Sequence, residues 1–430
     1  MKNRFSRPAI TPFTSYQKLV VALLSLLQFT IVLDFMVLSP LGDFLMKGLD
    51  IDPSGFGLVV SSYALSAGAS GFLAAGFADK YDRKKLLVFF YTGFIVGTLG
   101  CALANSYVLL LTARIVTGLF GGVIGAVSFA IIADLFLPEQ RGRVIGTTQM
   151  ALAASQVLGI PISLYLANHW GWHAPFIMIV VLAAAILLVI VAWMKPVTGH
   201  LAVQSDKSPY LHLLHALAKR PYQITFVSTA ALSIGGFMMM PFSSAFLVNN
   251  IKVTAEQLPL VFMASGIAAI VVMPLTGRLS DKMDKYKLFV IGSIIALIMI
   301  TVYTHLGEVP LWQIISVNIL MMVGIMSRMI PAMSINMAIP DMKDRGAFMS
   351  INSSLQQMAG GIAAICAGLI VRQESKSAPL EHYDTLGYVV AAVMILCLFL
   401  LYKVSELAKA KEAAVATHQM KAEEKAEAIV

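Results

Sequence analysis

Three charged residues lie inside long apolar stretches of the sequence. Asp34 lies near the middle of the first stretch, Arg114 lies in the fourth, and Arg328 lies in the tenth. A charged side chain inside a membrane is costly and is a candidate functional residue by default. These three residues are therefore the candidates for proton coupling or substrate binding.

Asp34 is a carboxyl group in a position that favours its neutral, protonated form. It could bind a proton on one side of a membrane and release it on the other. The same position in the second half of the chain is a glycine, Gly235, when Pro40 is aligned with Pro241. An acid in one half alone favours a specialised role, although a structural acid paired with Arg114 or with a polar neighbour is the alternative.

The two arginines allow different chemistry, because a guanidinium group stays charged and does not shuttle protons. Arg114 could stabilise the charged form of a nearby acid or bind an anion, and its counterpart in the second half lies near Ser316. Arg328 precedes Pro331, where a kink would expose backbone carbonyls, and it could bind a small anion. Both side chains could instead extend toward a membrane surface.

These residues must be positioned by membrane helices. The chain of 430 residues is 58% apolar and only 13% charged, with a mean hydropathy of +0.80. A spanning helix needs about 20 apolar residues, and runs such as Ile177–Met194 lack the alternation of a barrel strand. We expect an all-α membrane protein with twelve transmembrane helices at about 18–45, 55–77, 87–106, 107–135, 143–167, 173–195, 221–249, 257–279, 286–305, 310–338, 345–371 and 384–403.

The basic residues predict the topology. With the N-terminus inside, 25 of the 31 lysines and arginines fall in inner segments and 4 in outer loops. This bias places both termini in the cytoplasm and explains the net charge of +8, so nucleic-acid binding is not expected. The predicted divisions are an N-terminal tail (1–17), a six-helix half (18–195), a linker (196–220), a second six-helix half (221–403) and a tail (404–430).

The two halves are related by a shift of 202 residues. Ala78–Leu86 lies over Ser280–Leu288, and each segment follows the second helix of its half. Phe35, Met36 and Pro40 are echoed by Phe237, Met238 and Pro241. Two such pseudo-symmetric halves predict a substrate site at the midplane between them, reached alternately from each side.

These features resemble the major facilitator superfamily over about residues 18–403. The signature loop of that family is matched at Asp79 and Arg83, and again at Gly277 and Asp281. The resemblance implies that the acids contact helix starts of the opposite half and close the cytoplasmic side. The predicted cytoplasmic gate consists of Asp79, Arg83, Asp134, Arg141, Asp281 and Arg345.

Within the superfamily, the sequence is similar to the bacterial twelve-helix drug:proton antiporters. Leu33-Asp34-Phe35 followed by Pro40, and Arg114 followed by Gly118, resemble two motifs of that group. Gly159-Ile160-Pro161 keeps the glycine and proline of a third motif without its glycine pair. The resemblance implies proton-coupled efflux of an amphiphilic, drug-like molecule by a monomer in the bacterial inner (plasma) membrane.

Other residues carry weaker predictions. The pairs Gly93/Gly97 and Gly118/Gly122 predict close helix packing. Polar residues inside the spans are candidates for lining a cavity, namely Gln28, Gln149, Gln156, Asn318, Asn352 and Gln356. No nucleotide-binding loop, metal-ligand spacing or catalytic constellation occurs, so we expect no cofactor, no metal and no enzyme. The alternatives to efflux are a proton symporter or facilitator for a metabolite such as a sugar or nucleobase, and a receptor-like protein that transports nothing.

Overall fold

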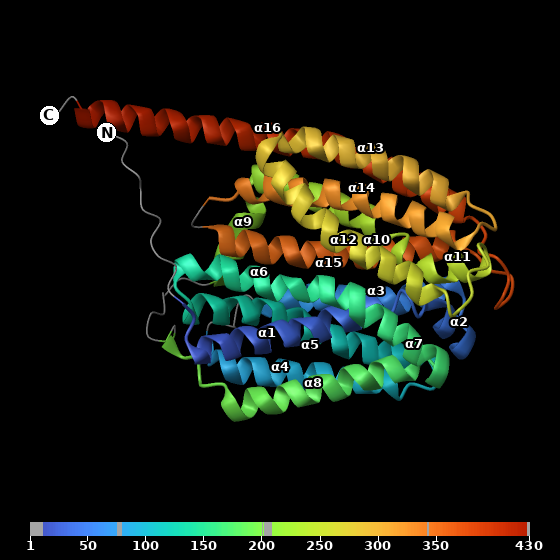
Figure 1. The fold of residues 1–430 in the computed structure, drawn as a ribbon. Coiled ribbons are helices and arrows are strands. Elements are labelled where there is room, and N and C mark those ends of the chain that lie inside the picture. Colours follow the sequence, from blue (N-terminus) through green and yellow to red (C-terminus); the bar gives the residue numbers. More distant parts are fainter. Residues whose placement is uncertain (1–11, 75–79, 200, 202–208, 342–343, 428–430) are drawn as a thin grey trace.

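The computed structural model describes residues 12–74, 80–199, 201, 209–341 and 344–427. In that part of the chain, twelve helices are long and apolar enough to cross a membrane, which confirms the predicted all-helical membrane fold. They run side by side as one bundle, with the N-terminal half next to the C-terminal half (Figure 1).

Among the described residues, the N-terminal half contains six spans and one short α-helix between the first two. The spans are α1 (Ser15–Val37), α3 (Pro53–Ala74), α4 (Arg83–Ala102), α5 (Tyr107–Leu135), a composite of α6 (Pro138–Ala154), η2 (Ser155–Gly159) and α7 (Ile160–Trp170), and α8 (His173–Trp193). The short helix α2 (Gly42–Leu49) follows α1. The composite span contains a π-helical turn just before Pro161, because proline has no N–H to continue the regular hydrogen-bond pattern.

The C-terminal half repeats this order after the short helix α9 (Pro209–Ala218). Its spans are α10 (Arg220–Phe237) with η4 (Met240–Phe242) and α11 (Ser243–Asn249), then α12 (Leu258–Lys282), α13 (Lys285–Thr304), α14 (Leu311–Ala338), α15 (Arg345–Ile370) and α16 (Tyr383–Glu427). The predicted tail continues the last span, since α16 extends well past the end of the bundle (Figure 1).

The repeated basic loops begin the third helix of each half in the same way. Asp82 accepts a hydrogen bond from the Lys84 backbone N–H at 2.9 Å, and Asp284 accepts one from the Lys287 backbone N–H at 3.0 Å. Such caps satisfy N–H groups that a helix start leaves free. The bond from Lys287 also holds the pKa of Asp284 below its ordinary value. Part of the repeated motif is therefore a pair of helix caps.

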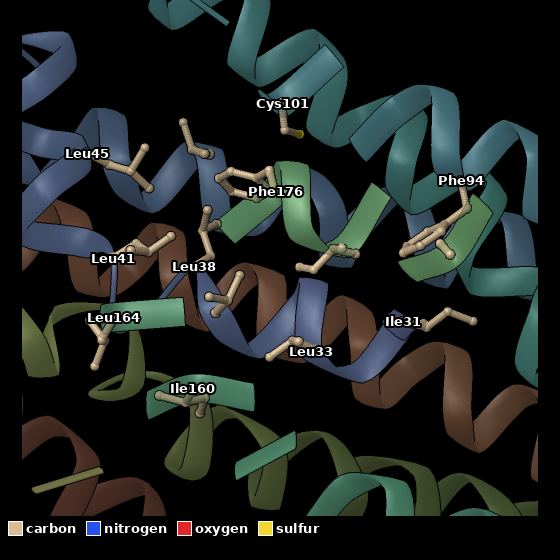
Figure 2. Close-up of a cluster of buried hydrophobic side chains, with 14 of the residues drawn as sticks. Ile31, Leu33, Leu38, Leu41, Leu45, Phe94, Cys101, Ile160, Leu164 and Phe176 are labelled. Atoms are coloured by element: carbon tan, nitrogen blue, oxygen red, sulfur yellow. The ribbon is translucent and has the colours of Figure 1, made fainter. Parts of the chain in front are cut away.

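Apolar side chains fill the interior of the N-terminal half. Figure 2 shows this cluster, where Leu33 of α1 lies near Ile160 of α7. The close fit requires a small residue, because a Cβ at Gly159 would lie 2.5 Å from the Leu33 side chain. The helix that carries Asp34 is therefore packed tightly against the composite fifth span.

The predicted glycine pairs do allow close packing. A Cβ at Gly97 of α4 would lie 2.7 Å from the backbone nitrogen of Thr117 in α5. A Cβ at Gly122 of α5 would lie 2.2 Å from the carbonyl oxygen of Ala67 in α3. The glycines thus let α3, α4 and α5 approach backbone to backbone.

The two halves meet along α3 and α15, and along α12 and the composite fifth span. Gly57 of α3 faces α15 so closely that a Cβ would lie 2.7 Å from the Ala364 carbonyl oxygen. Gly266 of α12 approaches Gln156 in the same manner, with a Cβ at 3.0 Å from its carbonyl carbon. These contacts bring the two halves together without intervening side chains.

Hydrogen bonds between the halves gather at the end of the bundle where α2 and α11 lie, which the basic residues predict to be the outer end. Asn249 of α11 donates to Asp43 of α2 at 2.7 Å, and Lys47 of α2 donates to the side-chain oxygen of Asn249 at 3.4 Å. Ser244 donates to the backbone carbonyl of Ser39 at 2.8 Å. This set of contacts, the outer contact, closes the predicted outer side.

Candidate functional site

Asp34 and Arg114 form a buried ion pair inside the N-terminal half. The Arg114 Nη1 atom lies 2.8 Å from Asp34 Oδ2, and the two side chains are 1% and 0% exposed. Thr98 of α4 donates to the other carboxylate oxygen at 3.3 Å. Both oxygens of Asp34 are thereby satisfied, and the pair joins α1, α4 and α5.

Aromatic and polar side chains enclose this pair. The guanidinium of Arg114 lies over the ring of Tyr63 in α3, 4.5 Å from its centroid, which is a favourable cation–π geometry. Thr117, one turn along α5, lies 3.9 Å from the thiol of Cys101. The Arg114 Nε atom is buried without a hydrogen-bond partner. The pair is therefore held by a close shell that leaves one donor unused.

A pocket between the halves lies on the other side of this shell. It is lined by Phe35, Ser39, Val60, Ala64, Phe237, Met240, Pro241, Gln357, Gly360 and Ala364. Phe35 contacts the ring of Tyr63 at 5.5 Å between centroids and that of Phe237 at 5.9 Å. A contact path thus runs from the pocket wall through Phe35 and Tyr63 to Arg114.

Arg328 lies in the interior of the C-terminal half, at 3% exposure. Its guanidinium is 5.6 Å from the ring centroid of Phe289 in α13 and beside the thiol of Cys397 in α16. Its Nε and Nη2 atoms are buried without a hydrogen-bond partner. The expected bond to a carbonyl freed by Pro331 does not satisfy these two atoms, and α14 continues through that proline.

The predicted gate residues at the basic end lie as follows. Arg83 pairs with Asp134 of the same half at 3.3 Å. Arg141 donates to the backbone carbonyl of Ala133 at 2.6 Å, also in its own half. The helix start at Arg141 was expected to meet Asp281, and the start at Arg345 was expected to meet Asp79. Asp281 and Arg345 are exposed, and Asp79 lies outside the described residues.

A second ionic cluster at this end was not predicted. Lys219, just before α10, bonds Asp344, and this hydrogen bond raises the pKa of the lysine. Asp341 accepts a hydrogen bond from Lys411 of α16 at 2.8 Å, which lowers the pKa of that carboxyl. These bonds connect α10, the loop after α14 and α16 within one half.

The polar cavity candidates are spread over several environments. Asn318 donates to the carbonyl of Ile314 in its own helix at 2.9 Å, and Asn352 accepts from Thr229 of α10 at 2.7 Å. Gln28, Gln156 and Gln356 are half-buried, and Gln149 is exposed. A neighbouring glutamine, Gln357, lines the pocket.

The site also contains residues that the sequence did not single out, above all Tyr63 and Thr98. A tyrosine or threonine in an apolar helix carries no distinctive signal, because it is common in helix packing. In the described part of the chain, no group of histidine, cysteine, aspartate or glutamate side chains could hold a metal ion.

Comparisons with known proteins agree with this architecture. The family model described as Major Facilitator Superfamily matches residues 24–338 and 225–425. An uncharacterized MFS-type transporter of Bacillus subtilis, YceJ, is 27% identical over 62% of this chain and 68% of its own length. Multidrug resistance protein 3 of the same organism is 28% identical over 46% of this chain and 38% of its own length.

The solved structure of a D-xylose-proton symporter has the same fold. It superposes with a TM-score of 0.77 over 92% of this chain and 99% of that chain, at 16% identity. The family model, which covers both halves, and the twelve apolar helices agree with this likeness. The chain is a multi-pass membrane protein and belongs to the major facilitator superfamily of transporters.

Proposed function

We propose that this chain exports an amphiphilic, drug-like molecule in exchange for protons, with Asp34 as the proton-binding group. The observation that carries the proposal is the buried Asp34–Arg114 pair. The rings of Tyr63 and Phe35 connect this pair to the pocket between the halves. The multidrug resistance relative supports this class of substrate.

The chemistry follows from the ion pair. A proton on Asp34 neutralises the carboxylate and removes its attraction for Arg114, leaving a buried cation that must find other partners. That change reaches Tyr63, whose ring contacts both Arg114 and Phe35. A molecule in the pocket contacts Phe35 from the opposite side. Proton binding and substrate binding therefore both change the contacts of Tyr63 and Phe35, and each event can alter the affinity for the other.

The outer contact supports the alternating-access part of the proposal. Hydrogen bonds between the halves close the predicted outer side, as in an inward-facing state. An outward-facing state requires these bonds to break and the basic end to close. The predicted gate residues Asp79, Asp281 and Arg345 are proposed to pair across the halves in that second state.

The test is proton flux in proteoliposomes that contain a pH-sensitive dye. Wild type, Asp34→Asn and Asp50→Asn are compared with a panel of lipophilic cations, sugars, nucleosides and amino acids. Asp50 is a matched control, because its carboxylate lies at the surface with a 79% exposed side chain. We expect a lipophilic compound to evoke flux in wild type and Asp50→Asn, and no flux in Asp34→Asn.

Two results would overturn parts of the proposal. Equal flux in wild type and Asp34→Asn would exclude Asp34 as the proton carrier. Proton movement in the same direction as a sugar or nucleoside would favour the alternative, a metabolite symporter, for which Ser39 and Gln357 supply polar groups in the pocket. The double variant Asp34→Asn/Arg114→Met removes both charges and keeps the test usable if the single variant does not fold.

A further inference from the structure

The interior of the C-terminal half contains a buried cation with no acidic partner among the residues that the structure describes. The ion pairs of those residues do not include Arg328, and two of its three guanidinium nitrogens lack any hydrogen-bond partner. Its neighbours include the aromatic ring of Phe289 and the thiol of Cys397, which hydrogen-bonds the guanidinium. Neither supplies the negative charge that a buried guanidinium requires.

An unpaired charge at this depth is strongly unfavourable. Buried charges in proteins are normally paired or bound to an ion of opposite sign, since their removal from water costs several kcal/mol. The N-terminal half meets this requirement by placing Asp34 against Arg114. The C-terminal half has a glycine where that acid would stand, so the compensating charge must come from elsewhere.

A glycine stands next to Arg328 at the position that corresponds to Asp34. A shift of 201 residues, from Pro40 to Pro241, puts Gly235 at the position of Asp34, and a shift of 202 puts Gly236 there. A Cβ at Gly235 would lie 3.8 Å from the Arg328 Nη1 atom, with no side chain between them. The backbone of α10 at this point therefore borders the guanidinium directly.

The next residue of α10 is exposed. Gly236 is exposed, and a Cβ there would meet nothing within 4 Å. Helix α10 ends one residue later, at Phe237, and Met240 begins the 3-10 turn η4 that follows. Met240 lines the pocket between the halves. The residue next to Gly235 therefore carries no side chain, and the space where a Cβ would stand is open.

We propose that Arg328, with the side-chain-free backbone at Gly235 and Gly236, forms a binding site for a singly charged anionic group in the C-terminal half. The group is either a free small anion or the carboxylate of a transported molecule. The site does not depend on proton coupling or on the direction of transport, so it can be tested when the chain moves nothing.

The experiment measures the melting temperature of the full chain in lipid nanodiscs at constant sodium concentration and ionic strength. Sodium gluconate, whose anion is bulky, is replaced stepwise by chloride, nitrate, acetate, benzoate or salicylate. Four proteins are compared: wild type, Arg328→Met, Gly235→Asp and Arg372→Gln. Arg372 is the matched control, because it is an exposed arginine at the predicted outer end.

Gly235→Asp provides an internal anion. Its Cβ would make only ordinary contacts, with Met394 at 3.5 Å and Val393 at 3.7 Å, so the variant is expected to fold. Its carboxylate should pair with Arg328, raise the melting temperature in gluconate and remove the response to added anions. It keeps the proposal testable if Arg328→Met does not fold.

We expect at least one anion to raise the melting temperature of wild type and Arg372→Gln by about 2 °C or more, as binding to the folded state requires. Arg328→Met and Gly235→Asp should not respond. A response to chloride or nitrate identifies a free anion, whereas a response to benzoate or salicylate alone identifies a substrate carboxylate. Equal responses in all four proteins, or no response in wild type, would overturn the proposal.

Discussion

The two halves share one fold but treat buried charge in opposite ways. In the N-terminal half, Arg114 has a carboxylate at 2.8 Å and an aromatic ring at 4.5 Å. In the C-terminal half, Arg328 has an aromatic ring at 5.6 Å and two unsatisfied nitrogens. The duplicated fold thus holds an arginine paired with an aspartate in one half. In the other half it holds an arginine without an acidic partner among the described residues.

This difference indicates how the work is divided between the halves. A complete ion pair can be opened by one proton, which suits energy coupling. An arginine without an acidic partner attracts an anionic group from outside the chain, which suits ligand binding. The first pair is connected to the pocket between the halves through Tyr63 and Phe35.

Breaking the complete pair should have the largest effect. Asp34→Asn leaves Arg114 buried and charged without its partner, and such a change typically costs about 3–5 kcal/mol. Arg114→Met should cost less, because the remaining carboxyl of Asp34 can accept a proton and become neutral. Thermal unfolding in detergent should therefore give the order wild type, Arg114→Met, Asp34→Asn from most to least stable. A melting temperature of Asp34→Asn equal to that of wild type would contradict the stabilising role of the Asp34–Arg114 pair.

The aromatic rings provide a smaller contrast. Tyr63→Leu removes the ring over Arg114 and should cost about 1–2 kcal/mol of cation–π attraction in addition to lost packing. Phe289→Leu removes the more distant ring near Arg328 and should cost less. Tyr63→Phe keeps the ring and is the control, with a melting temperature near that of wild type. Equal losses in the two leucine variants would show that packing alone stabilises both rings.

The smallest effect is expected for Arg328→Met in gluconate. Because the guanidinium has no acidic partner among the described residues, its removal takes away a cost rather than an attraction. The melting temperature should stay equal to that of wild type or rise, in contrast to the loss in Asp34→Asn. A fall of several degrees in this variant would mean that Arg328 has stabilising contacts of its own, and the two halves would then be alike.

Much of the fold could be predicted from the sequence, because membrane helices depend on local properties. Length, hydropathy and the distribution of basic residues are counted along the chain, and they indicate the twelve spans found among the described residues. The repeat at 202 residues was equally visible, since duplicated loops keep their residue types. The helix caps at Asp82 and Asp284 show why these loops share a pattern: both begin the third helix of a half.

The sequence by itself determined the candidates, because charge inside a membrane helix stands out from its neighbours. Asp34, Arg114 and Arg328 are each identified by what surrounds them along the chain. Only the tertiary structure decided which of them are paired. That outcome depends on how closely α1, α4 and α5 approach, which glycines such as Gly97 permit, and on the space left where Gly235 replaces an acid. Distances between helices come from packing across the whole bundle, and no local pattern in the sequence encodes them.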